Sequence, residues 1–120
     1  TKQGVSAIVS TEGNNACHII LRGSSIGTNF DKDSITSTSD LLETNGLSRC
    51  LMVDCSHGNS YKDHTRQKSV AHELGEQIAG GNRDIVAVMV ESHLIAGSQS
   101  LNSDKSKMVY GQSVTDACIG

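Results

Sequence analysis

The sequence lacks proline and is poor in aromatic residues. Its 120 residues include no Pro, no Trp, one Phe and two Tyr. Aromatic side chains bury more area than most others, so a small domain with so few of them has limited means to form a core of its own. We therefore expect something outside this chain to complete the core.

Long apolar runs and a basic face are missing as well. A helix that crosses a bilayer needs about 20 predominantly apolar residues, and no run in this sequence approaches that length. The 10 Lys and Arg are outnumbered by 13 Asp and Glu, which gives a formal net charge of −3 at pH 7. A nucleic-acid-binding domain would show a cluster of basic residues. The composition predicts a cytoplasmic protein that binds neither membranes nor nucleic acid.

The four cysteines follow neither a disulfide nor a zinc pattern. The sequence has no Cys-x-x-Cys pair, and Cys17 and Cys118 are far apart. Cys50 and Cys55 are separated by an odd offset on one predicted strand, so their side chains face opposite sides. We expect reduced thiols, as is usual in cytosolic proteins.

Local patterns predict an alternating order of strands and helices. The predicted elements are, in order, strands at 5–12 and 16–22, a helix at 34–43, a strand at 50–55, a helix at 65–79 and a strand at 84–91. The turn residues Gly13-Asn14-Asn15 predict that the first two strands form a hairpin. Asp33 or Ser34 is expected to cap the first helix, and Asn45-Gly46 to end it.

The second half of the chain has the clearest patterns. Val70, Leu74 and Ile78 share one face of the second helix, and Gly80-Gly81 closes it. The strand at 84–91 is almost wholly apolar, which is typical of a parallel strand buried on both faces. A long polar segment follows at 92–110. Because three parallel strands leave both sheet edges exposed, the chain is expected to pair with more strands or to be part of a longer one.

Three apolar runs each end near a residue that can bind charge or metal: Arg22, His57 and Glu91. In an α/β enzyme, parallel strands deliver such side chains to one shared rim. His57 and Glu91 are suitable ligands for a divalent ion, with Asp116 as a third from the tail. Arg22, next to a glycine, is suited to a bidentate grip on phosphate or carboxylate.

Structural alternatives exist for each of these residues. His57 could be a hydrogen-bonded turn residue, Glu91 a solvated strand end and Asp116 a helix N-cap. Among the other histidines, His93 could line the rim but ranks below His57. The remaining three are expected in the core or on the surface: His18 in the core, and His64 and His72 on the surface.

Five motifs give the chain a family resemblance. They are Cys17–Gly23 (CHIILRG), Val53–Ser60 (VDCSHGNS), Gln77–Gly81 (QIAGG), Val88–Leu94 (VMVESHL) and Val114–Gly120 (VTDACIG). In this order they resemble class I 3-deoxy-D-arabino-heptulosonate 7-phosphate (DAHP) synthases, of the bacterial and fungal type that aromatic amino acids regulate. The resemblance spans essentially the whole chain.

The resemblance implies a (β/α)8 barrel, of which residues 1–120 hold about the last three strands. The chain would then be the C-terminal part of a single catalytic domain, incomplete at both ends, with the hairpin before or within the first of these strands. The implied reaction condenses phosphoenolpyruvate with D-erythrose 4-phosphate and water, giving DAHP and phosphate. This is the first step of the shikimate pathway to aromatic amino acids.

The resemblance also implies site residues and partners. A divalent metal ion such as Mn, Fe or Co would be held by His57, Glu91 and Asp116, with His57 also counted as catalytic, and Arg22 would hold the phosphate of phosphoenolpyruvate. The family's fourth ligand is a cysteine on an early strand, and none of the four cysteines here matches its motif. We expect a homo-oligomer for the full-length protein and an aromatic amino acid as feedback inhibitor.

Two loops depart from the family pattern. Ser24-Ser25 stand where members usually have Gly-Lys, and Ala96-Gly97-Ser98-Gln99 stand where members have Glu-Gly-Asn-Gln. Because a metal ligand and most phosphate-binding residues are missing, we expect the chain alone to be inactive. The alternatives are a non-catalytic barrel fragment or partner-binding piece, and a sister synthase that makes an eight-carbon product from arabinose 5-phosphate. The segment Asp54–Ser60 argues against the sister synthase.

Overall fold

A small parallel sheet lies at the centre of the molecule. A computed structural model describes residues 4, 6–14 and 16–120. Strands β1 (Ile19–Leu21), β2 (Leu51–Asp54) and β3 (Ile85–Met89) lie side by side in chain order, and both pairings are parallel. The carboxyl ends of all three strands therefore meet at one edge of the sheet, as the sequence predicts.

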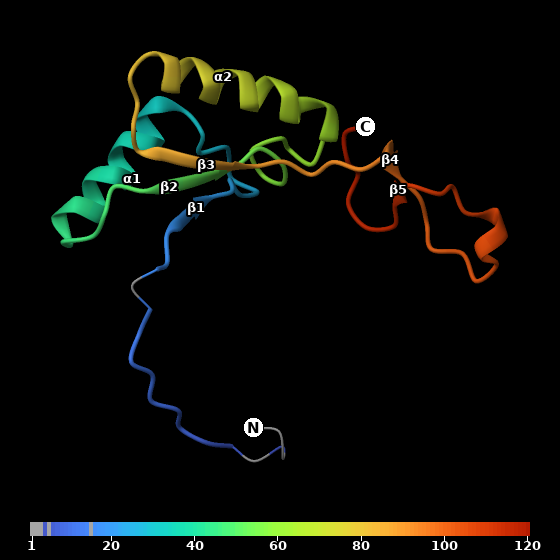
Figure 1. Cartoon of the computed structure of the whole chain (residues 1–120), viewed down its shortest axis with the longest axis horizontal. Coiled ribbons are helices and arrows are strands. Elements are labelled where there is room, and N and C mark those ends of the chain that lie inside the picture. Colours follow the sequence, from blue (N-terminus) through green and yellow to red (C-terminus); the bar gives the residue numbers. More distant parts are fainter. Residues whose placement is uncertain (1–3, 5, 15) are drawn as a thin grey trace.

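Two helices connect these strands. Helix α1 (Lys32–Thr44) joins β1 to β2, and α2 (Gln67–Ala79), which follows a short 3-10 helix at His64–Arg66, joins β2 to β3 (Figure 1). One hydrophobic core joins both helices to the sheet. Its members are Leu21, Ile35, Leu42, Leu51, Val53, Cys55, Val70, Leu74 and Ile85.

Helix α1 shows how local sequence sets a boundary. The carboxylate of Asp31 accepts hydrogen bonds from the Ser34 backbone N–H (2.9 Å) and hydroxyl (2.7 Å), which caps the helix start. The predicted helix is confirmed, but it begins two residues earlier than expected, and Asp33 and Ser34 are not its cap. At the other end Asn45 is the C-cap and Gly46 has φ +70°, a conformation that favours glycine.

The apolar stripe of α2 is shorter than its sequence pattern indicates. Val70 and Leu74 are buried as predicted, but Ile78, in the last turn of the helix, is 37% exposed. The helix ends at Ala79 with Gly80 as its C-cap, as predicted.

One face of the sheet is not covered within this chain. Ile85 is buried against the helices, but Val86 and Val88 point the other way and are 56% and 47% exposed. Ile20 on β1 is likewise 51% exposed. The expectation that β3 is buried on both faces is wrong for this chain, because no described segment packs against its second face. Such an apolar face is suited to burial against further protein.

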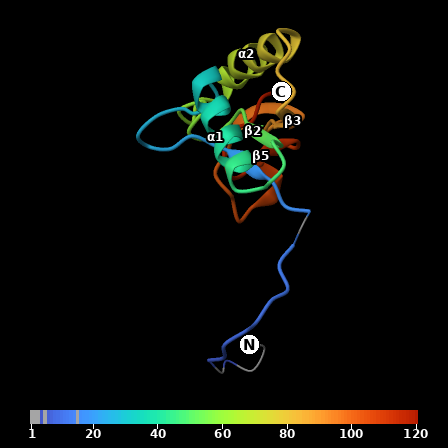
Figure 2. The ribbon, with the colours of Figure 1, turned by 90° about the vertical axis from the view of Figure 1, so that its left-hand side faces the viewer.

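The predicted N-terminal hairpin is wrong. Residues 6–14 form no strand, and Val5 and Asn15 lie outside the described residues. The segment runs away from the sheet in both views (Figures 1 and 2), with Ile8 fully exposed. Alternation alone does not hold a two-stranded hairpin together, because a pair of strands needs a surface to pack on. The strand predicted at 16–22 shrinks to β1, which pairs in parallel with β2 rather than with residues 5–12.

The C-terminal part returns toward the sheet. The long polar segment at 92–110, for which the sequence predicts no strand or helix, contains strand β4 (Ile95–Ser98) and a 3-10 helix at Lys105–Lys107. β4 pairs in parallel with β5 (Gln112–Ser113), which is too short and polar for its sequence to reveal. Beyond β5, Ile119 exchanges backbone hydrogen bonds with Glu91 and His93 at 3.0 and 2.9 Å. This return brings residue 116 close to the end of β3.

Two further predictions concern the whole chain. All four cysteines are free thiols, as expected. In the part of the chain that the structure describes, no helix is both long enough and apolar enough to cross a membrane.

Candidate metal centre

The structure brings His57, Glu91 and Asp116 together at the carboxyl edge of the sheet. His57 lies in the loop after β2, Glu91 two residues beyond β3, and Asp116 in the returning tail. His57 Nε2 is 3.5 Å from Glu91 Oε1 and 3.8 Å from Asp116 Oδ2. One ligand atom from each residue lies within 4.8 Å of the others. The three residues predicted from the sequence as ligands therefore share one site.

Asp54, the last residue of β2, contacts the Nδ1 side of the His57 imidazole. Asp54 Oδ2 lies 2.8 Å from His57 Nδ1, and Asp54 Oδ1 accepts a hydrogen bond from the Ser56 backbone N–H at 2.8 Å. The Asp54 side chain is only 3% exposed. This contact turns Nε2, the other ring nitrogen, toward Glu91 and Asp116.

Glu91 is held by two residues that sequence analysis did not identify. The Ser56 hydroxyl donates to Glu91 Oε2 at 2.8 Å. The buried Gln67, the first residue of α2, accepts from the Glu91 N–H (2.8 Å) and donates to its carbonyl (3.1 Å). Ser56 stands one residue from His57, which is a usable hint. Gln67 lies 24 residues from Glu91, and nothing in the spacing indicates this contact.

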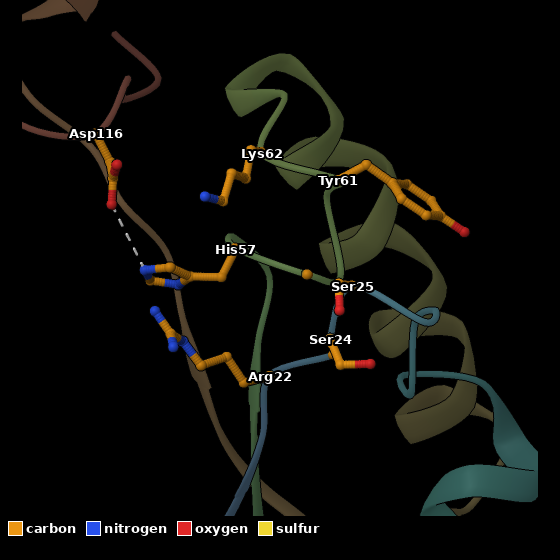
Figure 3. Close-up of a pocket in the computed structure, with 9 residues that line it drawn as sticks. Arg22, Ser24, Ser25, His57, Tyr61, Lys62 and Asp116 are labelled. Atoms are coloured by element: carbon orange, nitrogen blue, oxygen red, sulfur yellow. Dashed lines mark ion pairs between the residues drawn. The ribbon is translucent and has the colours of Figure 1, made fainter.

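Arg22 follows β1 and lies beside the His57 ring (Figure 3). Its Nε is 3.7 Å from Asp54 Oδ2, and its side chain is 61% exposed. The Arg22 side chain lines a cavity of about 450 Å³. The lining residues are Arg22, Gly23, Ser24, Ser25, His57, Gly58, Tyr61, Lys62 and Asp116. The departures from the family pattern at Ser24 and Ser25 therefore lie in the cavity wall.

The loop that contains Arg22 and the loop that contains His57 are in close contact. Gly23 has φ +70°, and a Cβ there would lie 2.6 Å from the Asn59 backbone nitrogen. The Asn59 N–H donates to the Arg22 carbonyl at 3.1 Å, and its side-chain amide donates to the carbonyls of Leu21 (3.2 Å) and Asp54 (2.9 Å). Asn59 is 1% exposed. Through these hydrogen bonds Asn59 links the carboxyl ends of β1 and β2.

The turn after β2 has an unusual backbone. His57, Tyr61 and Lys62 have φ of 48°, 54° and 61°, the left-handed region that side chains other than glycine rarely adopt. The Lys62 N–H donates to the His57 carbonyl at 2.8 Å, which closes the turn. Backbone strain of this kind is concentrated at functional sites in proteins. Figure 3 shows the Lys62 side chain on the same side as His57 and Tyr61 pointing away.

The other candidate residues lie outside this group. His18 is exposed, so the expectation of a core histidine is wrong. His93 is exposed and accepts a hydrogen bond from the Leu94 N–H at its own Nδ1. His72 is on the surface, 3.5 Å from Glu76, whereas His64 is half-buried in the 3-10 helix rather than on the surface.

None of the cysteines belongs to the ligand group. Cys55, the cysteine nearest to it in sequence, is fully buried. Burial, followed by the charge of Asp54, raises the pKa of its thiol to about 11. This is consistent with the expectation that no cysteine in this chain supplies the family's fourth ligand.

The donor set suits a divalent cation. One imidazole nitrogen and two carboxylate oxygens are ligands for Zn, Fe and Mn. Within the described residues, Glu91 and Asp116 form no ion pair with a lysine or arginine, and their nearest ring nitrogen is His57 Nε2. The ligand atoms of the two carboxylates lie within 4.8 Å of each other, and a cation between them would offset their mutual repulsion. The residues therefore fit a metal ion.

Comparison with known proteins gives the family. Residues 1–120 match the family model described as the DAHP synthetase I family. The chain belongs to this family. A putative phospho-2-dehydro-3-deoxyheptonate aldolase of Schizosaccharomyces pombe is 54% identical over 121 residues, covering 100% of this chain and 33% of that protein. The Phe-sensitive phospho-2-dehydro-3-deoxyheptonate aldolase of Escherichia coli K12 is 48% identical over 120 residues, covering 100% of this chain and 34% of that protein.

A solved structure has the same arrangement of elements. It is a phospho-2-dehydro-3-deoxyheptonate aldolase from Francisella tularensis SCHU S4, 45% identical, with a TM-score of 0.86 over 99% of this chain and 34% of that chain. The resemblance of the five motifs to DAHP synthases is confirmed, as is the parallel α/β arrangement. The chain spans about a third of the length of the relatives it matches.

Proposed function

We propose that this chain provides the metal-binding part of a DAHP synthase active site. The reaction joins phosphoenolpyruvate to the aldehyde carbon of D-erythrose 4-phosphate, adds water and releases phosphate. The observation that supports this most is the group of His57, Glu91 and Asp116, which lies beside Arg22 in a chain that matches the family along its whole length.

We propose that residues 1–120 form about the last three strands of a (β/α)8 barrel, as the C-terminal part of one catalytic domain. The uncovered apolar face of the sheet supports this, because barrel strands bury such a face inside the barrel. The position of the site supports it too, since barrel enzymes place catalytic groups at the carboxyl ends of their strands.

Each site residue has a task in this proposal. Arg22, with its exposed guanidinium in the cavity, binds the phosphate of phosphoenolpyruvate and stabilises its charge as it leaves. His57, Glu91 and Asp116 hold the divalent ion, such as Mn, Fe or Co. The chemistry that such an ion supplies when bound is polarisation of the aldehyde carbonyl. Asp54 and Asn59 hold His57 and Arg22 side by side.

The proposal extends to partners. The substrates are phosphoenolpyruvate and erythrose 4-phosphate, and an aromatic amino acid is the expected feedback inhibitor, as the name of the Phe-sensitive E. coli relative suggests. A homo-oligomer and a cytoplasmic location stay predictions. The chain alone is expected to be inactive, because the other phosphate-binding residues and the fourth metal ligand lie outside it.

A chimera tests the proposal. Residues 1–120 replace the matching third of the E. coli relative, and erythrose 4-phosphate-dependent consumption of phosphoenolpyruvate is measured with Mn²⁺ present. We expect turnover in the chimera, its loss with His57→Asn, and none in the 120-residue chain alone. A second chimera, built on the 54% identical S. pombe protein, shows whether a loss of turnover comes from the junction in the first chimera. Folded chimeras without turnover would contradict the proposal, and turnover by the chain alone would contradict the predicted inactivity.

A further inference from the structure

We propose that Asp54 is a positioning residue that fixes the tautomer of His57, so that the lone pair of Nε2 is directed into the site. The inference rests on the proposed function for its consequence, which is metal binding. The state of the imidazole ring itself can be measured without any metal.

The Asp54 carboxylate is buried and fully occupied. Its side chain is 3% exposed. Oδ1 accepts the Ser56 N–H at 2.8 Å, and Oδ2 faces both His57 Nδ1 at 2.8 Å and Arg22 Nε at 3.7 Å. The Ser56 N–H donates to Oδ1, and the Arg22 guanidinium, which can only donate, faces Oδ2. With two donor groups around it, the carboxylate is placed to act as an acceptor toward the third neighbour, the His57 ring, as well.

The tautomer of His57 follows from this contact. A neutral imidazole has one nitrogen that donates and one that accepts. With Asp54 as the acceptor, the neutral ring of His57 carries its hydrogen on Nδ1, and Nε2 keeps its lone pair. Nε2 is the atom that lies 3.5 Å from Glu91 and 3.8 Å from Asp116. A carboxylate behind a ligating histidine orients the ring and raises its basicity.

The backbone of His57 explains why the ring needs such a partner. The backbone of His57 has φ 48°, in the left-handed region that residues other than glycine rarely adopt. Local sequence alone therefore does not favour this backbone conformation. The spacing Asp54-x-x-His57 places the end of β2 directly behind the ring. Asp54 itself is fixed because it is the last residue of a buried strand and its carbonyl accepts from Asn59. The rigid part of the fold thus sets the orientation of a side chain on a strained turn.

The test is nitrogen NMR of the metal-free, ¹⁵N-labelled full chain, with Asp54→Asn and a matched control, Asp63→Asn. Asp63 lies at the end of the same turn and accepts from Thr65, but it has no contact with His57. At a pH at which the imidazole is neutral, we expect His57 of the unaltered chain to carry its hydrogen on Nδ1 and none on Nε2. Asp54→Asn is expected to increase the Nε2–H form, and Asp63→Asn to leave the ring unchanged.

Binding of Co²⁺ alone, followed by its visible absorption, gives the second measurement. Loss of a partner behind a ligating histidine typically weakens metal affinity about 10–100-fold, so Asp54→Asn should show such a loss and Asp63→Asn none. The NMR result on the unaltered chain does not depend on any variant folding. Nδ1 of His57 without hydrogen, or Co²⁺ affinity unchanged in Asp54→Asn, would overturn the inference. An Nδ1–H ring, with no Co²⁺ bound either by the chain or by the chimera that contains the fourth ligand, would support the inference and overturn the proposed metal site instead.

Discussion

Replacing Gly23 by alanine tests whether close packing between the loops after β1 and β2 holds the site together. Gly23 and Gly46 both have φ +70°, so alanine is strained at both positions. Only Gly23 is crowded: its added Cβ would lie 2.6 Å from Asn59 N and 2.6 Å from the Gly58 carbonyl carbon, whereas Gly46 has nothing within 4 Å. Gly46→Ala is therefore the matched control.

The free-energy cost of Gly23→Ala exceeds that of Gly46→Ala by the cost of crowding alone. A left-handed conformation costs a non-glycine residue about 1–2 kcal/mol, which applies to both variants. Forcing extra atoms into a packed region costs about 1–3 kcal/mol more, which applies to Gly23→Ala only. The neighbouring atoms are mainly backbone, so they have little freedom to move aside. We expect Gly23→Ala to lower the free energy of unfolding by about 2–5 kcal/mol in total.

Urea unfolding followed by far-ultraviolet circular dichroism measures both variants on the full chain. The same two substitutions in the chimera show the effect on catalysis. Gly23→Ala separates Arg22 from His57 and should reduce turnover, while Gly46→Ala, at the far end of α1, should not. Equal destabilisation by the two variants, or unaltered turnover with Gly23→Ala, would refute the reasoning that loop contact sets the site.

Three further predictions concern stability and accessibility. Cys17 is exposed and Cys55 is buried with a pKa raised to about 11, so a thiol reagent read by mass spectrometry should label Cys17 first and Cys55 only on unfolding. Hydrogen bonds from Arg49 lower the pKa of Asp84 below its ordinary 3.8, so the stability that Asp84 contributes is present at neutral pH and lost as the pH falls below 3.8 toward the lower value of the folded state. Asp84→Asn should flatten that acid dependence in unfolding titrations, and an unchanged dependence would count against the ion pair. Val88→Lys on the uncovered sheet face should change the stability of the chain by no more than about 0.5 kcal/mol, as for surface sites. The same substitution should prevent folding of the chimera, and a normally folded chimera would mean that this face stays exposed.

The parts of the fold that sequence patterns predict are those in which neighbouring residues determine the outcome. The stripe of Val70 and Leu74 reveals α2, and the apolar runs ending near Arg22, His57 and Glu91 reveal the three parallel strands. Because parallel strands end at a common edge, the meeting of these side chains follows from topology.

The errors arise where partners are distant in sequence. Alternation in residues 6–12 resembles a strand, but no neighbouring strand is available to it. The pairing of β4 with β5 depends on a chain return rather than on an apolar pattern. Gln67 holds Glu91 across 24 residues, and no local rule indicates that contact. Asp54 and Ser56 are the missed residues with a local indication, because they stand three residues and one residue before His57.

A crystal structure of the chimera grown with Mn²⁺, with anomalous scattering to locate the ion, tests the metal site itself. We expect one ion bonded to His57 Nε2 and to carboxylate oxygens of Glu91 and Asp116, with Asp54 hydrogen-bonded to His57 Nδ1. An ion bound by other residues, with these three side chains turned away from it, would show that they do not form the metal site.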